Sequence, residues 1–142
     1  MMGIFERLYY FSVVFTSTMK HIHFHAVGNK FDRLHSIANE YYEKSNADSD
    51  LFGEWAMEYG EEIQNPSDAA KLLDAIVEND NQYNWENGIK AISDWTQQYI
   101  EETTTVRKSK YASDDIKSEL DTIIRYWKKE NDYKNEVRLK EI

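Results

Sequence analysis

The chain has 142 residues, a formal net charge of −9 and an isoelectric point near 4.9. This length fits one domain, residues 1–142, with a substantial core. The negative charge disfavours sequence-independent DNA binding, which needs a cationic surface. Cysteine is absent, which excludes disulfides and thiolate metal sites, and no apolar run is long enough to cross a membrane. We expect a soluble, cytoplasmic protein.

Apolar side chains recur every three or four residues over four long segments, the spacing of amphipathic helices. The first helix is predicted over Ile4 to Ala26, ending at Gly28-Asn29, which suits a turn. The second is predicted from about Lys30 to Tyr59 and crosses Asn46 to Asp50, where helix propensity is low and a break would divide it. Its buried face is expected to hold Phe31, Leu34, Ala38, Ser45, Ser49, Phe52 and Tyr59.

Three further helices are predicted in the second half of the chain. Asn65-Pro66 fits the N-cap and first residue of a short helix. A third long helix is predicted over Asn84 to Arg107, and Ser113 is expected to cap a fourth. The buried side of the fourth is predicted to comprise Ile116, Leu120, Ile123, Trp127 and Val137. Four long helices with a short one between the second and third predict an all-α four-helix bundle.

All four histidines lie in one short stretch. His23 and His35 are equally far from Asn29, so a hairpin that turns there places their imidazoles side by side. Neutral imidazole is a common ligand of transition metals. This pair is therefore a candidate half of a metal site.

The second helix carries further candidate ligands. Asn39 lies one turn beyond His35, and Asp50 and Glu54 form an i, i+4 pair suited to one ion. However, His35 and Asp50 are about 22 Å apart on one helix at 1.5 Å per residue. A twofold dimer with antiparallel second helices removes this conflict, because each copy then faces its imidazoles toward the other copy's carboxylates.

These spacings resemble the inter-subunit ferroxidase centre of Dps-type mini-ferritins, which belong to the ferritin-like superfamily. The family pattern H-W-N-V-x-G-x-x-F-x-x-L-H reads here as His23, Phe24, His25, Ala26, Val27 and Gly28, followed by Phe31, Leu34 and His35. The resemblance also covers the later offsets to Asn39, Asp50 and Glu54.

The resemblance implies a ferritin-like bundle that binds ferrous iron at the dimer interface and oxidises it with peroxide or dioxygen. The catalytic residues would be His23, His35, Asp50 and Glu54, with Asn39 as a further ligand. Ferric iron would be stored inside a homo-oligomer, a dodecamer built from twofold dimers. Zinc could compete with iron for the same ligands.

The chain departs from the family pattern at Asn39, where aspartate is usual. A neutral amide binds a cation more weakly, so the alternative is a ferritin-like oligomer that has lost ferroxidase activity and acts as a structural or interaction protein. His21 and His25 are either added ligands or exposed, hydrogen-bonded side chains. Many mini-ferritins bind DNA through a lysine-rich tail, and Met1 to Glu6 carry no lysine, so DNA binding is not expected.

A competing resemblance is local. His21 to Val27 fit the H-φ-H-φ-H-φ-φ motif of histidine-triad nucleotide hydrolases, which needs a strand so that alternate imidazoles share one face. That motif closes a mixed α+β domain, whereas here only Met1 to Lys20 precede it. We therefore favour the mini-ferritin interpretation.

Overall fold

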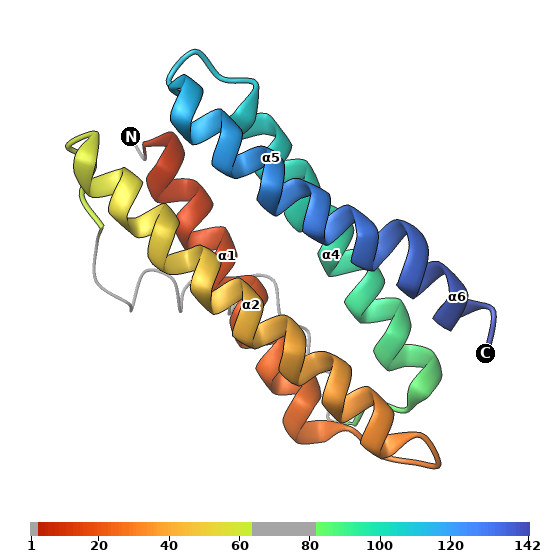
Figure 1. Cartoon of the computed structure of the whole chain (residues 1–142). Helices are drawn as coiled ribbons and strands as arrows, with labels where there is room; N and C mark the ends of the chain where they lie inside the picture. Colours follow the sequence, from red (N-terminus) through yellow and green to blue (C-terminus); the bar gives the residue numbers. More distant parts are fainter. Residues whose placement is uncertain (1–2, 64–81) are drawn as a thin grey trace.

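A computed structural model of the chain describes residues 3–63 and 82–142, which form a bundle of helices (Figure 1). The long helices are α1 (Ile4–His25), α2 (Phe31–Glu58), α4 (Trp85–Arg107) and α5 (Asp114–Lys128). A π-helical segment, η1 (Lys129–Asn135), and a short helix, α6 (Glu136–Leu139), extend α5. The predicted all-α bundle is confirmed, and the predicted helix at Asn65-Pro66 lies outside the described residues.

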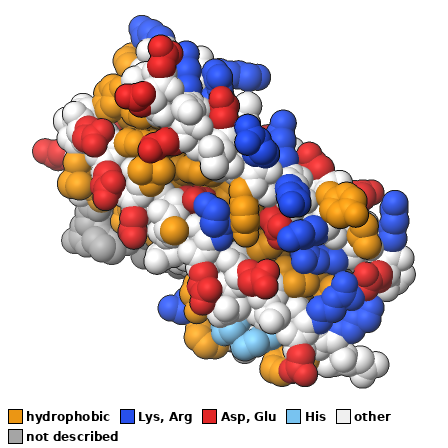
Figure 2. Space-filling model, viewed as in Figure 1, with side chains coloured by type: hydrophobic (Ala, Val, Ile, Leu, Met, Phe, Trp, Pro, Cys, Tyr) orange, Lys and Arg blue, Asp and Glu red, His pale blue; other side chains and the backbone are white. Residues whose placement is uncertain are grey.

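Charged side chains are spread unevenly over the bundle (Figure 2). On the face in view, acidic side chains gather over α2, whereas lysine and arginine side chains, with acidic ones among them, run along the line from α5 to α6. A partner that docks on α2 therefore meets an acidic surface.

None of the helices within residues 3–63 and 82–142 combines the length and hydrophobicity needed to cross a bilayer.

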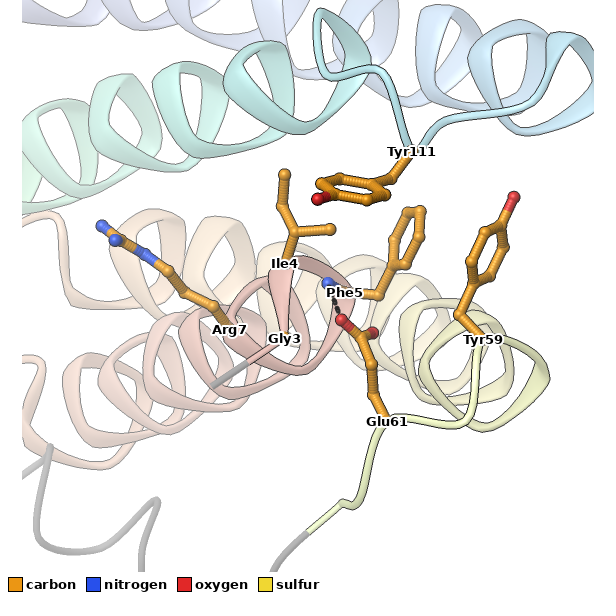
Figure 3. Close-up of a pocket in the computed structure, with 7 residues that line it drawn as sticks. All are labelled: Gly3, Ile4, Phe5, Arg7, Tyr59, Glu61 and Tyr111. Carbon is orange, nitrogen blue, oxygen red and sulfur yellow. Dashed lines mark hydrogen bonds between the residues drawn. The ribbon is translucent and has the colours of Figure 1, made fainter. Parts of the chain in front are cut away.

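The connection between α2 and α4 has its two described ends at opposite ends of the bundle (Figure 1). Just after α2, the Glu61 carboxylate accepts a 3.3 Å hydrogen bond from the backbone N–H of Phe5, at the start of α1 (Figure 3). Just before α4, the Tyr83 N–H donates to the carbonyl of His25, at the end of α1, over 2.9 Å. Consequently α2 and α4 run parallel, and α1 and α5 run antiparallel to them.

Local capping explains the helix ends. Asn84 and Asn87 exchange hydrogen bonds of 2.9 and 2.7 Å at the start of α4, each side chain accepting from the other's backbone N–H. The Ser113 hydroxyl accepts from the N–H of Ile116 over 3.3 Å at the start of α5. Gly28 has φ +91°, which only glycine adopts without strain, and it turns the chain from α1 into α2. Both predicted ends of α1, α2 and α4 and the predicted start of α5 are confirmed to within one or two residues.

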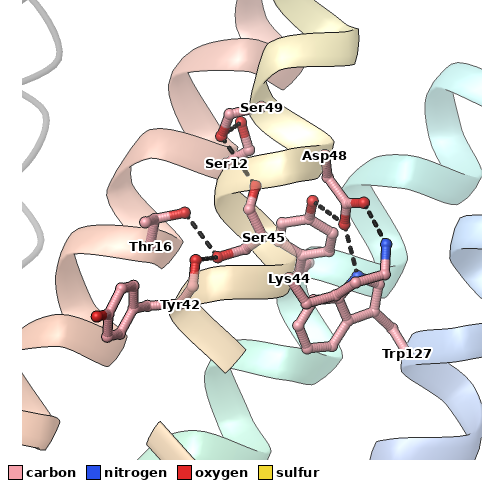
Figure 4. A network of polar contacts seen from close by, with 9 residues as sticks. Ser12, Thr16, Tyr42, Lys44, Ser45, Asp48, Ser49 and Trp127 are labelled. Carbon is pink, nitrogen blue, oxygen red and sulfur yellow. Dashed lines mark hydrogen bonds and ion pairs between the residues drawn. The ribbon is translucent and has the colours of Figure 1, made fainter. Parts of the chain in front are cut away.

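Helix α2 continues without a break through Asn46 to Asp50, because its small side chains let it pack closely on α1 (Figure 4). The Ser45 and Thr16 hydroxyls are 2.6 Å apart, and Ser49 donates to the Ser12 hydroxyl over 2.8 Å. The three serine hydroxyls also hydrogen-bond to backbone carbonyls of their own helices, so these buried polar groups are satisfied both within and between α1 and α2. Tertiary packing therefore overrides the low helix propensity of this segment.

The core is built around aromatic rings and one buried carboxylate. Trp127 of α5 packs against Phe15, Tyr41 and Tyr99, with ring centroids 5.2 to 5.3 Å apart. Among them lies Asp48 of α2, whose side chain is 3% exposed (Figure 4).

Asp48 has three hydrogen-bonding partners. One carboxylate oxygen accepts from the Tyr99 hydroxyl over 2.9 Å and from the Trp127 indole N–H over 2.8 Å. The other is 2.6 Å from the Lys44 ammonium. Asp48 thus ties α2 to both α4 and α5.

Three residues that were predicted to be buried are exposed: Phe31 by 42%, Tyr59 by 44% and Val137 by 48%. Phe31 and Tyr59 lie at the two ends of α2, where fewer neighbours cover a side chain. Val137 follows η1, whose wider turn directs Asn131 and Asn135 toward the core and Val137 away from it. The π-helical segment was not predicted.

Candidate functional site

The hairpin between α1 and α2 brings His23 and His35 together, as the spacing about Asn29 predicts. Their rings are stacked, with centroids 3.7 Å apart and planes inclined by 23°. Both side chains are partly exposed at one end of the bundle. Two imidazoles therefore share one site within a single chain.

Hydrogen bonds fix the tautomer of both rings. His23 Nδ1 is 3.1 Å from the carbonyl oxygen of His35, and His35 Nδ1 is 2.8 Å from the carbonyl oxygen of His23. A carbonyl oxygen can only accept, so each Nδ1 carries the hydrogen. The lone pair of each neutral ring is then on Nε2, which is the arrangement that metal-ligating histidines usually have.

The carboxylates of the predicted site lie elsewhere on α2. Asp50 and Glu54 are exposed, and the rise of the unbroken helix separates Asp50 from His35 by about 22 Å. Asn39 is one turn from His35, and its amide nitrogen donates to Glu43 over 3.3 Å. Among residues 3–63 and 82–142, no three histidine, aspartate or glutamate side chains come together as metal ligands would.

His35, Asn39, Asp50 and Glu54 nevertheless share one side of α2. At 100° per residue they span an arc of about 100°, and this arc faces away from the core side chains Tyr41 and Phe52. The structure thus brings His23 and His35 together, adds Asn39 beside them, and leaves Asp50 and Glu54 on the same exposed face.

The other two histidines lie nearer the start of α4. The rings of His21 and His25 are 4.1 Å apart, and His25 Nδ1 is 2.8 Å from the carbonyl oxygen of His21. The His21 ring also meets the edge of Tyr83 at 5.7 Å. Because His21 to His25 are helical, the strand that a histidine-triad hydrolase needs is not formed, and that interpretation is wrong.

No protein-family model, curated protein or solved structure matches this chain.

The sequence analysis did not predict the contacts of two further carboxylates, Asp48 and Glu61. Asp48 falls on the buried stripe of α2, which the sequence spacing could have revealed, but its partners come from distant helices. Glu61 borders a cavity of about 510 Å³ at the end of the bundle that holds the α1 N-terminus. Its second carboxylate oxygen is buried without a hydrogen-bond partner in the described part of the chain, and burial raises the pKa of Glu61 above its usual value.

Proposed function

We propose that this chain is a ferritin-like protein that binds and oxidises ferrous iron at a site shared by two copies. His23 and His35 of one copy would provide nitrogen ligands, and Asp50 and Glu54 of the other would provide oxygen ligands. The stacked histidine pair, with both Nε2 lone pairs kept available, is the observation that carries this proposal.

The helix topology supports a ferritin-like fold. Ferritin-like bundles have four long helices and one long crossover connection, which makes the second and third long helices parallel. Here α2 and α4 are parallel, and the ends of their connection lie at opposite ends of the bundle. A short helix within that connection remains a prediction.

A twofold axis supplies the missing half of the site. If two copies of α2 pack antiparallel with the axis between Tyr42 and Glu43, His35 lies opposite Asp50 of the second copy. The opposite pairing follows by symmetry, so one contact creates two equivalent sites. Each site then has two imidazoles and two carboxylates.

This donor set suits ferrous iron, with zinc as a competitor. Glu54 would anchor or bridge the ion, Asp50 would add a second carboxylate, and the histidines would supply neutral nitrogen. Peroxide or dioxygen would accept the electrons, and the ferric product would be stored in a closed homo-oligomer, which we propose is a dodecamer. Asn39 carries no charge, so a second iron is expected to bind weakly.

Peroxide-dependent oxidation of ferrous iron tests this proposal. We expect oxidation by the wild-type chain and its loss in both His35→Ala and Glu54→Ala. The matched control is His25→Ala, which removes an imidazole of α1 outside the proposed site and should leave oxidation unchanged. Wild-type rates in both site variants would contradict the proposal.

A ferritin-like oligomer without oxidase activity is the second candidate. The hydrogen bond from Asn39 to Glu43 favours it, because it places an amide where a carboxylate would otherwise face the site. In that case the wild-type chain binds ferrous iron and assembles. However, peroxide oxidises the iron no faster in the presence of the protein than in buffer alone. The same oxidation assay separates the two candidates.

A further inference from the structure

The exposed face of α2 is strongly acidic and is not neutralised by the part of the chain that the structure describes. It carries six exposed carboxylates: Asp32, Glu40, Glu43, Asp50, Glu54 and Glu58. The basic side chains of α2 are engaged with other groups, Arg33 with Glu141 and Lys44 with Asp48. In the described residues, none of the six carboxylates has a lysine or arginine at ion-pair distance.

The proposed twofold contact would press two such faces together. With the axis between Tyr42 and Glu43, the Glu43 side chains of the two copies are neighbours. Asp32 of one copy then lies within a residue of the position opposite Glu54 of the other. Like charges brought together across an interface oppose association.

We propose that a divalent cation is what joins the two copies. Without metal, repulsion between the acidic α2 faces keeps the chain monomeric. When a cation binds His23 and His35 of one copy and Asp50 and Glu54 of the other, it places positive charge between the faces and closes the dimer. This inference rests on the proposed function, because it uses the same shared site.

Linkage gives the size of the effect. Two equivalent sites form in each dimer. Each site multiplies the dimer association constant by one plus the ratio of the metal concentration to the dissociation constant of the metal. At ten times that constant, the dimer association constant rises about 100-fold. A chain whose dimer dissociation constant in chelator is about ten times its concentration then changes from mostly monomeric to mostly dimeric.

Sedimentation velocity of the full chain tests this, with zinc as a probe that undergoes no redox reaction. We expect a monomer in EDTA and a dimer, or the larger oligomer that such dimers build, in zinc, and no zinc-driven association of His35→Ala or Glu54→Ala. Glu43→Gln removes a repelling charge but no ligand, so its dimer should form at lower zinc concentration. Glu101→Gln, an exposed carboxylate of α4, is the matched control and should behave as wild type. Circular dichroism verifies that every variant is folded.

The possible failures can be told apart when zinc binding is measured separately by equilibrium dialysis. A stable dimer in EDTA whose zinc binding requires His35 and Glu54 would overturn this inference and leave the proposed function intact. Absence of zinc binding, or zinc binding by a chain that stays monomeric, would overturn both. Association in EDTA that disappears with added salt would indicate contact between the acidic α2 face of one copy and the lysine and arginine side chains along α5 to α6 of another. That result would also overturn the inference.

Discussion

Replacing Asp48 with alanine should destabilise the bundle more than any other single loss of charge in α2. Two of its partners, the Tyr99 hydroxyl and the Trp127 indole N–H, belong to side chains that are fully buried. Each donor left without an acceptor costs about 1 to 3 kcal/mol. The ion pair with Lys44 adds at most about 1 kcal/mol, because the ammonium is one-third exposed and can return to water.

The sum predicts that Asp48→Ala lowers the free energy of unfolding by about 2 to 7 kcal/mol, a range that brackets the loss of about 3 to 5 kcal/mol typical of a broken buried ion pair. Domains of this kind are stable by about 5 to 15 kcal/mol, so the variant should unfold at a much lower urea concentration. Asp48→Asn keeps one carbonyl acceptor and should lose less, about 1 to 3 kcal/mol. Tyr99→Phe removes one donor but leaves the carboxylate two partners, and it should lose about 1 kcal/mol.

Urea unfolding followed by circular dichroism in EDTA measures these differences. Asp50→Asn is the matched control, since Asp50 is exposed on the same helix and its replacement should change stability by less than about 0.5 kcal/mol. If Asp48→Ala were no less stable than Asp50→Asn, with an unchanged dependence on urea, Asp48 would not join the helices as described.

Three other predictions concern the α1 N-terminus, alkaline pH and the iron site. A Cβ at Gly3 would lie 1.8 Å from the Glu61 carboxylate, which accepts a hydrogen bond from the Phe5 N–H at the start of α1. Gly3→Ala should therefore displace this carboxylate and lower the free energy of unfolding by about 1 kcal/mol in urea titrations. Burial raises the pKa of Tyr126 from 10.0 to about 12, and burial beside the Asp48 carboxylate raises the pKa of Tyr99 well above its usual value. Between pH 10 and 12 the unfolded chain therefore binds fewer phenol protons than the folded chain, and chemical unfolding at several pH values should show stability falling as pH rises. Asn39→Asp adds one carboxylate beside His35, and it should tighten ferrous iron binding about fivefold in anaerobic titrations; unchanged affinity would place Asn39 outside the site.

The helices could be predicted from the sequence because their signals are local. Apolar spacing, the caps at Asn84 and Ser113, and the turn at Gly28 each act within a few residues. The meeting of His23 and His35 followed from the same local turn. The register of such a helical hairpin is set by its turn and does not depend on the rest of the fold.

The features that could not be predicted depend on contacts between distant segments. Spacing places Asp48 on the buried side of α2, but it does not reveal that Tyr99 and Trp127, from two other helices, are the donors that satisfy its carboxylate. Likewise, η1 changes the register after Trp127, so that Val137 points outward although an uninterrupted α-helical pattern suggested burial. The iron site that we propose would be closed by a second copy, which the fold of one chain does not contain.

Mixing two inactive variants tests most directly whether the site is shared. His35→Ala lacks part of the imidazole half and Glu54→Ala lacks part of the carboxylate half, so each chain alone should bind no ferrous iron at this site. Co-refolded in equal amounts, they should recover about a quarter of the wild-type sites if pairing is random and about half if metal selects the mixed pairs, because each mixed pair has one intact site of two. If the mixture binds no more iron than the separate variants, the two halves do not come from different copies.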